Sequence, residues 1–198
     1  DARMLRQQLD QLKVAIGMPS LITLRLQAQL GGAELRLGNL DQGIKQFAEV
    51  YDGLKQLGEG YSVPPTLRLE AAYSLGIAYM RRGETRNCCL RNSPDSCLLP
   101  IKGRGIHATQ EDSKQAIIYF EEVLQKAPQD SPMYLKAKWL LNVMYMTIDG
   151  YPDEVPKEYL IQPRVFESEE PLPRFTNVAS KLGVDTFGLA GGAIVDDF

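Results

Sequence analysis

The feature that most constrains this 198-residue chain is a pair of amphipathic helices separated by a long insert. The first half, residues 68–83, has apolar and small residues at helical spacing and ends on Gly83. The second half, residues 113–128, is amphipathic and ends at Pro128. The insert, residues 84–110, is much longer than the few residues that normally join two packed helices. We therefore expect a helical protein in which some interaction holds this insert in place.

Joined across the insert, the two halves resemble a tetratricopeptide repeat, a helix pair that stacks on similar neighbours. The matching residues are Leu75, Gly76 and Tyr79 on the first helix, and Ala116, Phe120 and Pro128 on or after the second. A first pair over residues 21–51 fits less closely, since Glu34 replaces the usual aromatic residue. The helix predicted over residues 133–148 resembles the first helix of a third pair.

This resemblance implies an all-α fold, a tetratricopeptide-like α-solenoid of about three helix pairs. An irregular helical bundle with the same periodicity is the alternative. The helical domain spans residues 1–150, beginning with a helix over residues 2–16, and a Pro-rich linker follows over residues 151–172. In residues 173–198, β-branched and apolar residues alternate with turn residues, which predicts strand character and a short β-hairpin.

The C-terminal segment resembles the opening of the FG-GAP/VCBS-type β-propeller of ASPIC/UnbV and cartilage-acidic-protein-like exported proteins. The similar residues are Phe-Thr-Asn-Val-Ala at 175–179, Leu182-Gly183, and Gly-Ala-Ile-Val-Asp-Asp-Phe at 192–198. Bacterial members with a tetratricopeptide region also resemble the insert, at Asn87-Cys88, Cys97-Leu-Leu-Pro100 and Gly105-Ile-His107.

Membership would imply a truncated exported protein, periplasmic or on the cell surface, whose signal peptide is absent from this chain. It would also imply that Asp197 is a calcium ligand in the full-length protein only, where an Asp-rich loop would continue. We expect no cofactor in this fragment, and calcium in the complete propeller.

Composition and motifs argue against several classes of function. The formal net charge is −3 and Lys and Arg are dispersed, so nucleic-acid binding is not expected. No apolar run approaches the roughly 20 residues of a transmembrane helix. The sequence has no Gly-x-Ser-x-Gly, His-Glu-x-x-His or P-loop pattern, which predicts a protein that is not an enzyme.

The insert contains every cysteine and the only histidine of the chain. A disulfide between Cys88 and Cys97 would close a small loop and stabilise the fold by about 2–3 kcal/mol. Unpaired buried thiols are a second interpretation. A zinc site formed by Cys88, Cys89, Cys97 and His107 is a third, although adjacent cysteines lack the usual ligand spacing. His107 could also act as a base, but a lone loop histidine is more often structural.

The inner face of such a solenoid comes from the first helix of each pair and commonly binds an extended peptide or a helix. The residues expected on this face are Arg25, Glu70, Tyr73, Ile77, Lys136 and Trp139. The sequence therefore predicts a protein-protein docking or assembly module. Two readings compete with this: Tyr73 and Trp139 pack within the protein, or the Cys/His insert serves a metal-handling or enzymatic role together with the missing propeller.

Overall fold

The computed structural model describes residues 2–16, 20–58, 63–91, 93, 95, 96, 98–167, 176 and 178–184. The chain divides into two compact units, Asp1–Phe166 and Glu167–Phe198, which are described separately.

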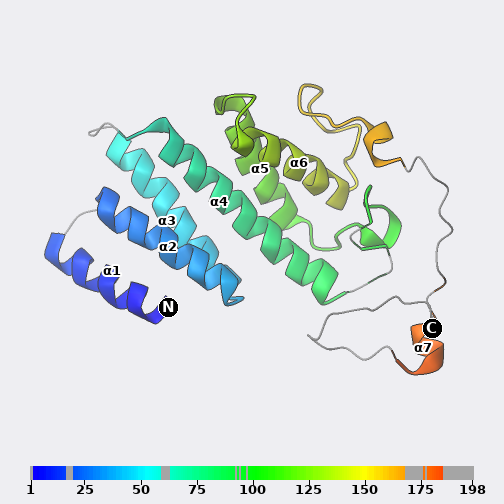
Figure 1. The fold of residues 1–198 in the computed structure, drawn as a ribbon, viewed down its shortest axis with the longest axis horizontal. Helices are drawn as coiled ribbons and strands as arrows, with labels where there is room; N and C mark the ends of the chain where they lie inside the picture. Colours follow the sequence, from blue (N-terminus) through cyan, green and yellow to red (C-terminus); the bar gives the residue numbers. More distant parts are fainter. Residues whose placement is uncertain are drawn as a thin grey trace, which may run out of the picture. The chain divides into compact units, whose positions relative to one another are not determined.

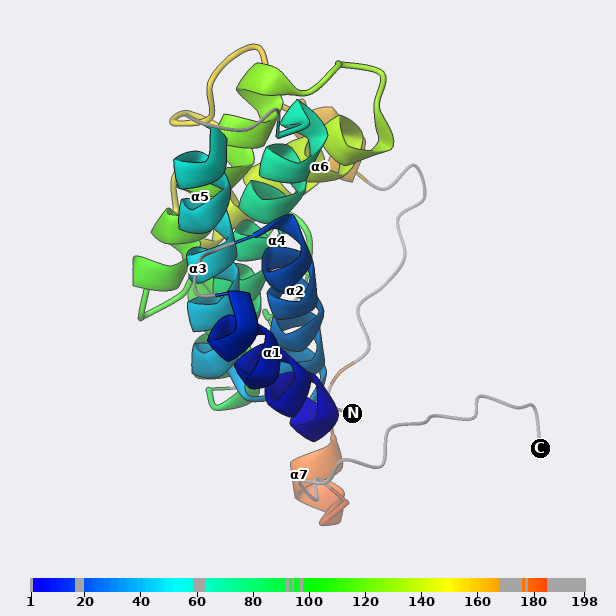
Figure 2. The same ribbon diagram turned by 90° about the vertical axis from the view of Figure 1, so that its left-hand side faces the viewer.

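The first unit is a stack of six long helices (Figure 1). They are α1 (Ala2–Ile16), α2 (Leu21–Arg36), α3 (Leu40–Gly58), α4 (Pro65–Glu84), α5 (Glu111–Lys126) and α6 (Pro132–Thr147). Each packs mainly against the helices before and after it in sequence. Figure 2 shows two layers, with α3 and α5 in one and α2, α4 and α6 in the other. The predicted all-α, solenoid-like fold is confirmed.

Local sequence signals set the helix boundaries. Ser20 and Thr23 form a reciprocal cap at the start of α2, in which each side-chain oxygen accepts the other residue's backbone N–H. Ser131 accepts the backbone N–H of Tyr134 at the start of α6, and Pro132 occupies the first turn. These caps satisfy N–H groups that have no partner within the helix.

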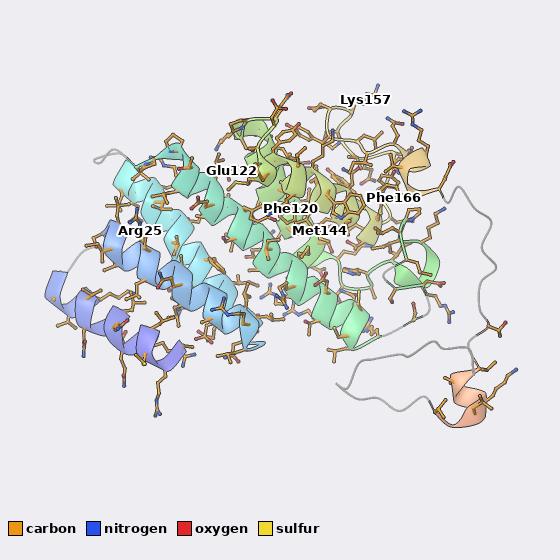
Figure 3. All side chains as sticks on the ribbon, in the orientation of Figure 1. Arg25, Phe120, Glu122, Met144, Lys157 and Phe166 are labelled. Carbon is orange, nitrogen blue, oxygen red and sulfur yellow. The ribbon has the colours of Figure 1, made fainter. Side chains whose placement is uncertain are left out.

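Glycines allow the helices of each pair to approach closely. A Cβ atom on Gly76 of α4 would lie 2.8 Å from the ring of Phe120 on α5. Similarly, a Cβ atom on Gly53 of α3 would lie 2.7 Å from the side chain of Leu24 on α2. Phe120 is completely buried, and Figure 3 shows it with Met144 where α4, α5 and α6 meet. The predicted second pair thus forms despite its insert.

Glu34, which departs from the repeat pattern, has a structural role. Its side chain is 1% exposed and accepts hydrogen bonds from Arg6 of α1 and from Asn39. Burial alone would raise the pKa of Glu34, but the hydrogen bonds from Asn39 and Arg6 bring it below its ordinary value. The ionised carboxylate therefore anchors α1 to α2.

No second helix follows α6 in the described part of the first unit. Residues 151–166 instead form an irregular segment against α6, ending in a short 3-10 helix, Pro163–Phe166. Tyr159 stacks edge-on against Tyr134 of α6, and Phe166 lies 5.5 Å from Trp139 between ring centroids. The solenoid thus consists of α1, two helix pairs, α6 and this segment.

In the second unit, the strand prediction is wrong for residues 179–182, which form the short helix α7 (Ala179–Leu182). Gly183 adopts a left-handed backbone with φ of 66°, and the backbone N–H of Val184 bonds to the carbonyl of Ala179. This arrangement is a common helix C-terminus. The remainder of the expected hairpin, residues 185–198, lies outside the described residues.

Candidate binding groove and the cysteine-histidine insert

A groove of about 230 Å³ lies between α2 and α4, with α3 as its floor. Leu24, Phe47, Val50, Leu54 and Ala71 contribute apolar side chains. Because each of these residues is largely buried, the floor of the groove is fixed by the core. The groove is therefore an apolar recess supported by three helices.

Polar residues mark the sides of this groove. Arg25 and Gln29 come from α2, and Glu70 and Ser74 come from α4. Among the described residues, neither Arg25 nor Glu70 forms an ion pair, so both charges are available to a ligand. The structure thus brings together two of the residues predicted to bind a partner, at one recess. Figure 3 labels Arg25 on α2.

The other predicted partner-binding residues lie elsewhere on α4 and α6. Tyr73 and Ile77 are half-buried and pack against the core of α5 and α6, with 6.0 Å between the ring centroids of Tyr73 and Phe120. Lys136 is exposed on α6. Trp139 is 41% exposed and contacts Phe166, a contact with the segment that follows α6. None of these four residues lines the α2–α4 groove.

His107 attaches the insert to α5 and α6. It is only 3% exposed and donates its backbone N–H to the carbonyl of Thr147 on α6, at 2.8 Å. Its Nδ1 lies 3.0 Å from Ser113 Oγ on α5, and Thr147 Oγ1 donates to that hydroxyl oxygen at 2.9 Å. Burial lowers the pKa of His107 below its ordinary value, although the charge of Asp112 opposes this shift.

On its other side, His107 Nε2 lies 3.5 Å from Cys88 Sγ. A thiol, an imidazole and a hydroxyl in a row are the groups of a nucleophile-base arrangement. However, His107 and Ser113 are buried, and both ring nitrogens of His107 face protein groups, Ser113 Oγ and Cys88 Sγ. This geometry favours the structural interpretation of His107.

Asn87 provides a second attachment for the insert. It lies in a turn of π-helix, η1 (Thr85–Cys89), that continues α4. Its side-chain amide donates to the carbonyls of Gly83 and Thr109 and accepts the backbone N–H of Thr109, each at 2.9 Å. The amide thus satisfies backbone groups of an extended segment that has no sheet to join.

Asn142 of α6 makes the same kind of contact with residues 151–166. Its amide donates to the carbonyls of Lys138 and Tyr159 and accepts the backbone N–H of Ile161. In both cases one amide hydrogen bonds to the backbone carbonyl four residues earlier in the same helix. The other amide hydrogen and the amide oxygen bond to the backbone of the irregular segment that lies against the helix. We call Asn87 and Asn142 the amide bridges.

A buried carboxylate ties the insert end of α4 to α5. Asp112 is 1% exposed and accepts hydrogen bonds from Arg82 at 2.6 Å and 3.0 Å and from Arg86 at 2.9 Å. Arg82 also pairs with Asp41 at the start of α3. Because two guanidinium groups satisfy the carboxylate, its burial is compensated.

The three interpretations of the cysteines remain predictions. Cys88 is half-buried and Cys89 is exposed, whereas Cys97 lies outside the described residues, so the predicted Cys88–Cys97 disulfide is not tested. Within the described ranges, no three His, Cys, Asp or Glu side chains gather as metal ligands. Asp197, the predicted calcium ligand of the full-length protein, also lies outside the described part of the chain.

Sequence reasoning missed the amide bridges and the Asp112 network. The spacing of Arg82 and Arg86, four residues apart, places both on one helical face and was a usable signal for a shared partner. No comparable pattern marks Asn142. A polar residue within an apolar helix does not indicate which backbone segment its side chain will bond.

The fold and the groove together describe the class of this protein. It is all-α and solenoid-like, with a recess between the first helices of two neighbouring pairs. Comparisons of this chain with protein-family models, curated proteins and solved structures find no match. None of the helices in the described ranges combines the length and apolar character needed to cross a membrane.

Proposed function

We propose that this chain is a non-catalytic docking module that binds a segment of another protein in the α2–α4 groove. The observation that carries the proposal is the combination of an apolar floor with the unpaired side chains Arg25 and Glu70. Apolar anchors give most of the affinity at protein interfaces, and charges around them select the partner. The partner segment should therefore present an apolar side chain flanked by one acidic and one basic residue.

The resemblance to FG-GAP/VCBS proteins supports a cellular setting for this activity. In that setting the solenoid would be a docking or assembly domain of an exported protein, beside a calcium-dependent propeller that starts within residues 173–198 and has Asp197 as a calcium ligand. Sequencing the gene past Phe198 tests this part, since repeated Asp-rich loops are expected there. A continuation without such loops would remove the family argument and leave the docking proposal on the groove alone.

A peptide selection followed by groove blocking tests the docking proposal. Peptides are selected from a random displayed library on the intact chain, and the affinity of the best one is measured by fluorescence polarisation. Ser74→Trp fills the groove from its wall, and Ile118→Trp places the same side chain on an exposed position of α5 in the other layer.

We expect Ser74→Trp to weaken binding at least about tenfold, a loss of roughly 1.4 kcal/mol, while Ile118→Trp leaves it unchanged. Circular dichroism and thermal unfolding verify that both variants fold. Equal affinities for the two variants would show that the selected peptides bind elsewhere and would contradict the proposal.

A further inference from the structure

A second recess lies between the C-terminal part of α3, the N-terminal part of α4 and the C-terminal part of α5, and it shares no lining residue with the α2–α4 groove. It has a volume of about 250 Å³ and is lined by Tyr51, Lys55, Pro65, Arg68, Leu69, Glu122 and Lys126. Three of these residues are cationic and one is anionic. Figure 3 labels Glu122, which lies on α5.

Both oxygens of the carboxylate that lines the recess accept a hydrogen bond. Lys126 Nζ bonds to Glu122 Oε1 at 2.8 Å, and the Tyr51 hydroxyl donates to Glu122 Oε2 at 2.5 Å. Burial by itself would raise the pKa of Glu122, but the hydrogen bonds from Lys126 and Tyr51 lower it below the ordinary value. Glu122 therefore balances one of the three positive charges of the recess.

The remaining cations, Lys55 and Arg68, also line the recess, and the charge of Lys55 helps to lower the pKa of Glu122. The Lys55 ammonium lies 4.4 Å from the centre of the Tyr51 ring. The Arg68 guanidinium lies against Gly58 at the end of α3, where a Cβ atom would be only 1.7 Å from Arg68 Nη2. Among the described residues, neither cation forms a salt bridge.

We infer that this recess binds an organic carboxylate, with its anionic group between Lys55 and Arg68 and its apolar group against Pro65 and Leu69. The excess of two positive charges suits a small anion, and the apolar wall favours an organic one. Inorganic phosphate is a poorer match, because it has no group to place against Pro65 and Leu69. A peptide C-terminus with an apolar last residue has the required chemistry. This inference does not depend on the docking groove.

The test uses N-acetyl-leucine as the probe and measures amide and side-chain chemical shifts of the intact chain by NMR. Matched ligands are N-acetyl-leucinamide, which lacks the charge, and inorganic phosphate, which lacks the apolar group. We expect saturable shifts at Lys55, Arg68 and Leu69 with N-acetyl-leucine only, at millimolar concentrations and weakening as salt is added.

Two variants and one control locate the site. Arg68→Gln should weaken binding about tenfold. Gly58→Ala should weaken it by a factor of about three, because its Cβ displaces the flexible guanidinium while the charge is retained. Lys45→Gln removes an exposed cation elsewhere on α3 and should have no effect.

Three outcomes would overturn the inference. They are no shifts up to tens of millimolar N-acetyl-leucine, equal binding of the neutral amide, or tighter binding of phosphate than of the carboxylate. Equal affinities of Arg68→Gln and Lys45→Gln would likewise show that the carboxylate binds outside this recess.

Discussion

Gly76 is the residue on which the packing of the second helix pair most directly depends. Replacing it with alanine puts a methyl group 2.8 Å from the Phe120 ring, which is closer than packed carbons approach. Overpacking costs about 1–3 kcal/mol, and the better helix propensity of alanine returns up to about 1 kcal/mol. We predict that Gly76→Ala lowers the free energy of unfolding in urea by about 1–2 kcal/mol.

Gly32 provides the matched control for this prediction. It lies in α2, where the nearest atom to an added Cβ is Arg36 Nη1 at 3.6 Å, an ordinary contact. Gly32→Ala should therefore stabilise the protein by about 0.5–1 kcal/mol through helix propensity alone. If Gly76→Ala stabilised the protein as Gly32→Ala is expected to do, the close contact between Gly76 and Phe120 would be refuted.

His107 makes the stability of the folded chain depend on pH. Its folded pKa is lowered by burial, so the unfolded chain binds a proton more readily as the pH falls below about 6.5. The neutral ring thus contributes stability that is complete above pH 6.5 and is lost as the pH falls toward the folded pKa.

The part of this pH dependence that comes from His107 should be absent in His107→Gln. Urea unfolding between pH 7.5 and 5.5 should show a smaller loss of stability in the variant than in the wild type, whatever their stabilities at pH 7.5. The pKa of Glu84 is raised by burial, so Glu84 also contributes to the pH dependence, and it does so in both proteins. Subtracting the pH profile of the variant from that of the wild type therefore removes the contribution of Glu84. Parallel pH profiles would show that His107 is protonated equally in the folded and unfolded states.

At the scale of elements, the two amide bridges hold two irregular segments on the solenoid. Asn142→Leu keeps the approximate side-chain volume but leaves the backbone groups of Tyr159 and Ile161 without partners. We predict that local opening of residues 151–166 becomes easier by about 2–3 kcal/mol. Amide hydrogen exchange measures this directly.

Asn87→Leu is the complementary variant, because it releases the insert and leaves residues 151–166 attached. Each substitution should therefore raise exchange in its own segment only. Faster exchange across all helices in either variant would mean that the bridge supports the whole fold and not one segment.

The helices were predictable from sequence because apolar periodicity, caps and close-approach glycines all gave the same answer. The segments between them were not, since their positions depend on single polar contacts such as Asn142 with Ile161. The strand expectation failed at residues 179–182, because these residues form a short helix that Gly183 ends with a left-handed backbone.

The candidate site was predicted only in part, for a related reason. Helical register placed Arg25 and Glu70 on the inner face, and they line the groove. The same register did not show that Tyr73 would pack on Phe120 or that Trp139 would contact Phe166. Both aromatic partners come from other elements, and a periodic pattern within one helix carries no information about them.

At the scale of the whole molecule, the central claim is that the α2–α4 groove selects a partner segment by its charges. The direct test exchanges these charges in Arg25→Glu combined with Glu70→Lys, both at exposed positions, and repeats the peptide selection. The account predicts peptides in which the acidic and basic residues around the apolar anchor exchange places relative to those selected by the wild type. Selection of the same charge order by both proteins would contradict it.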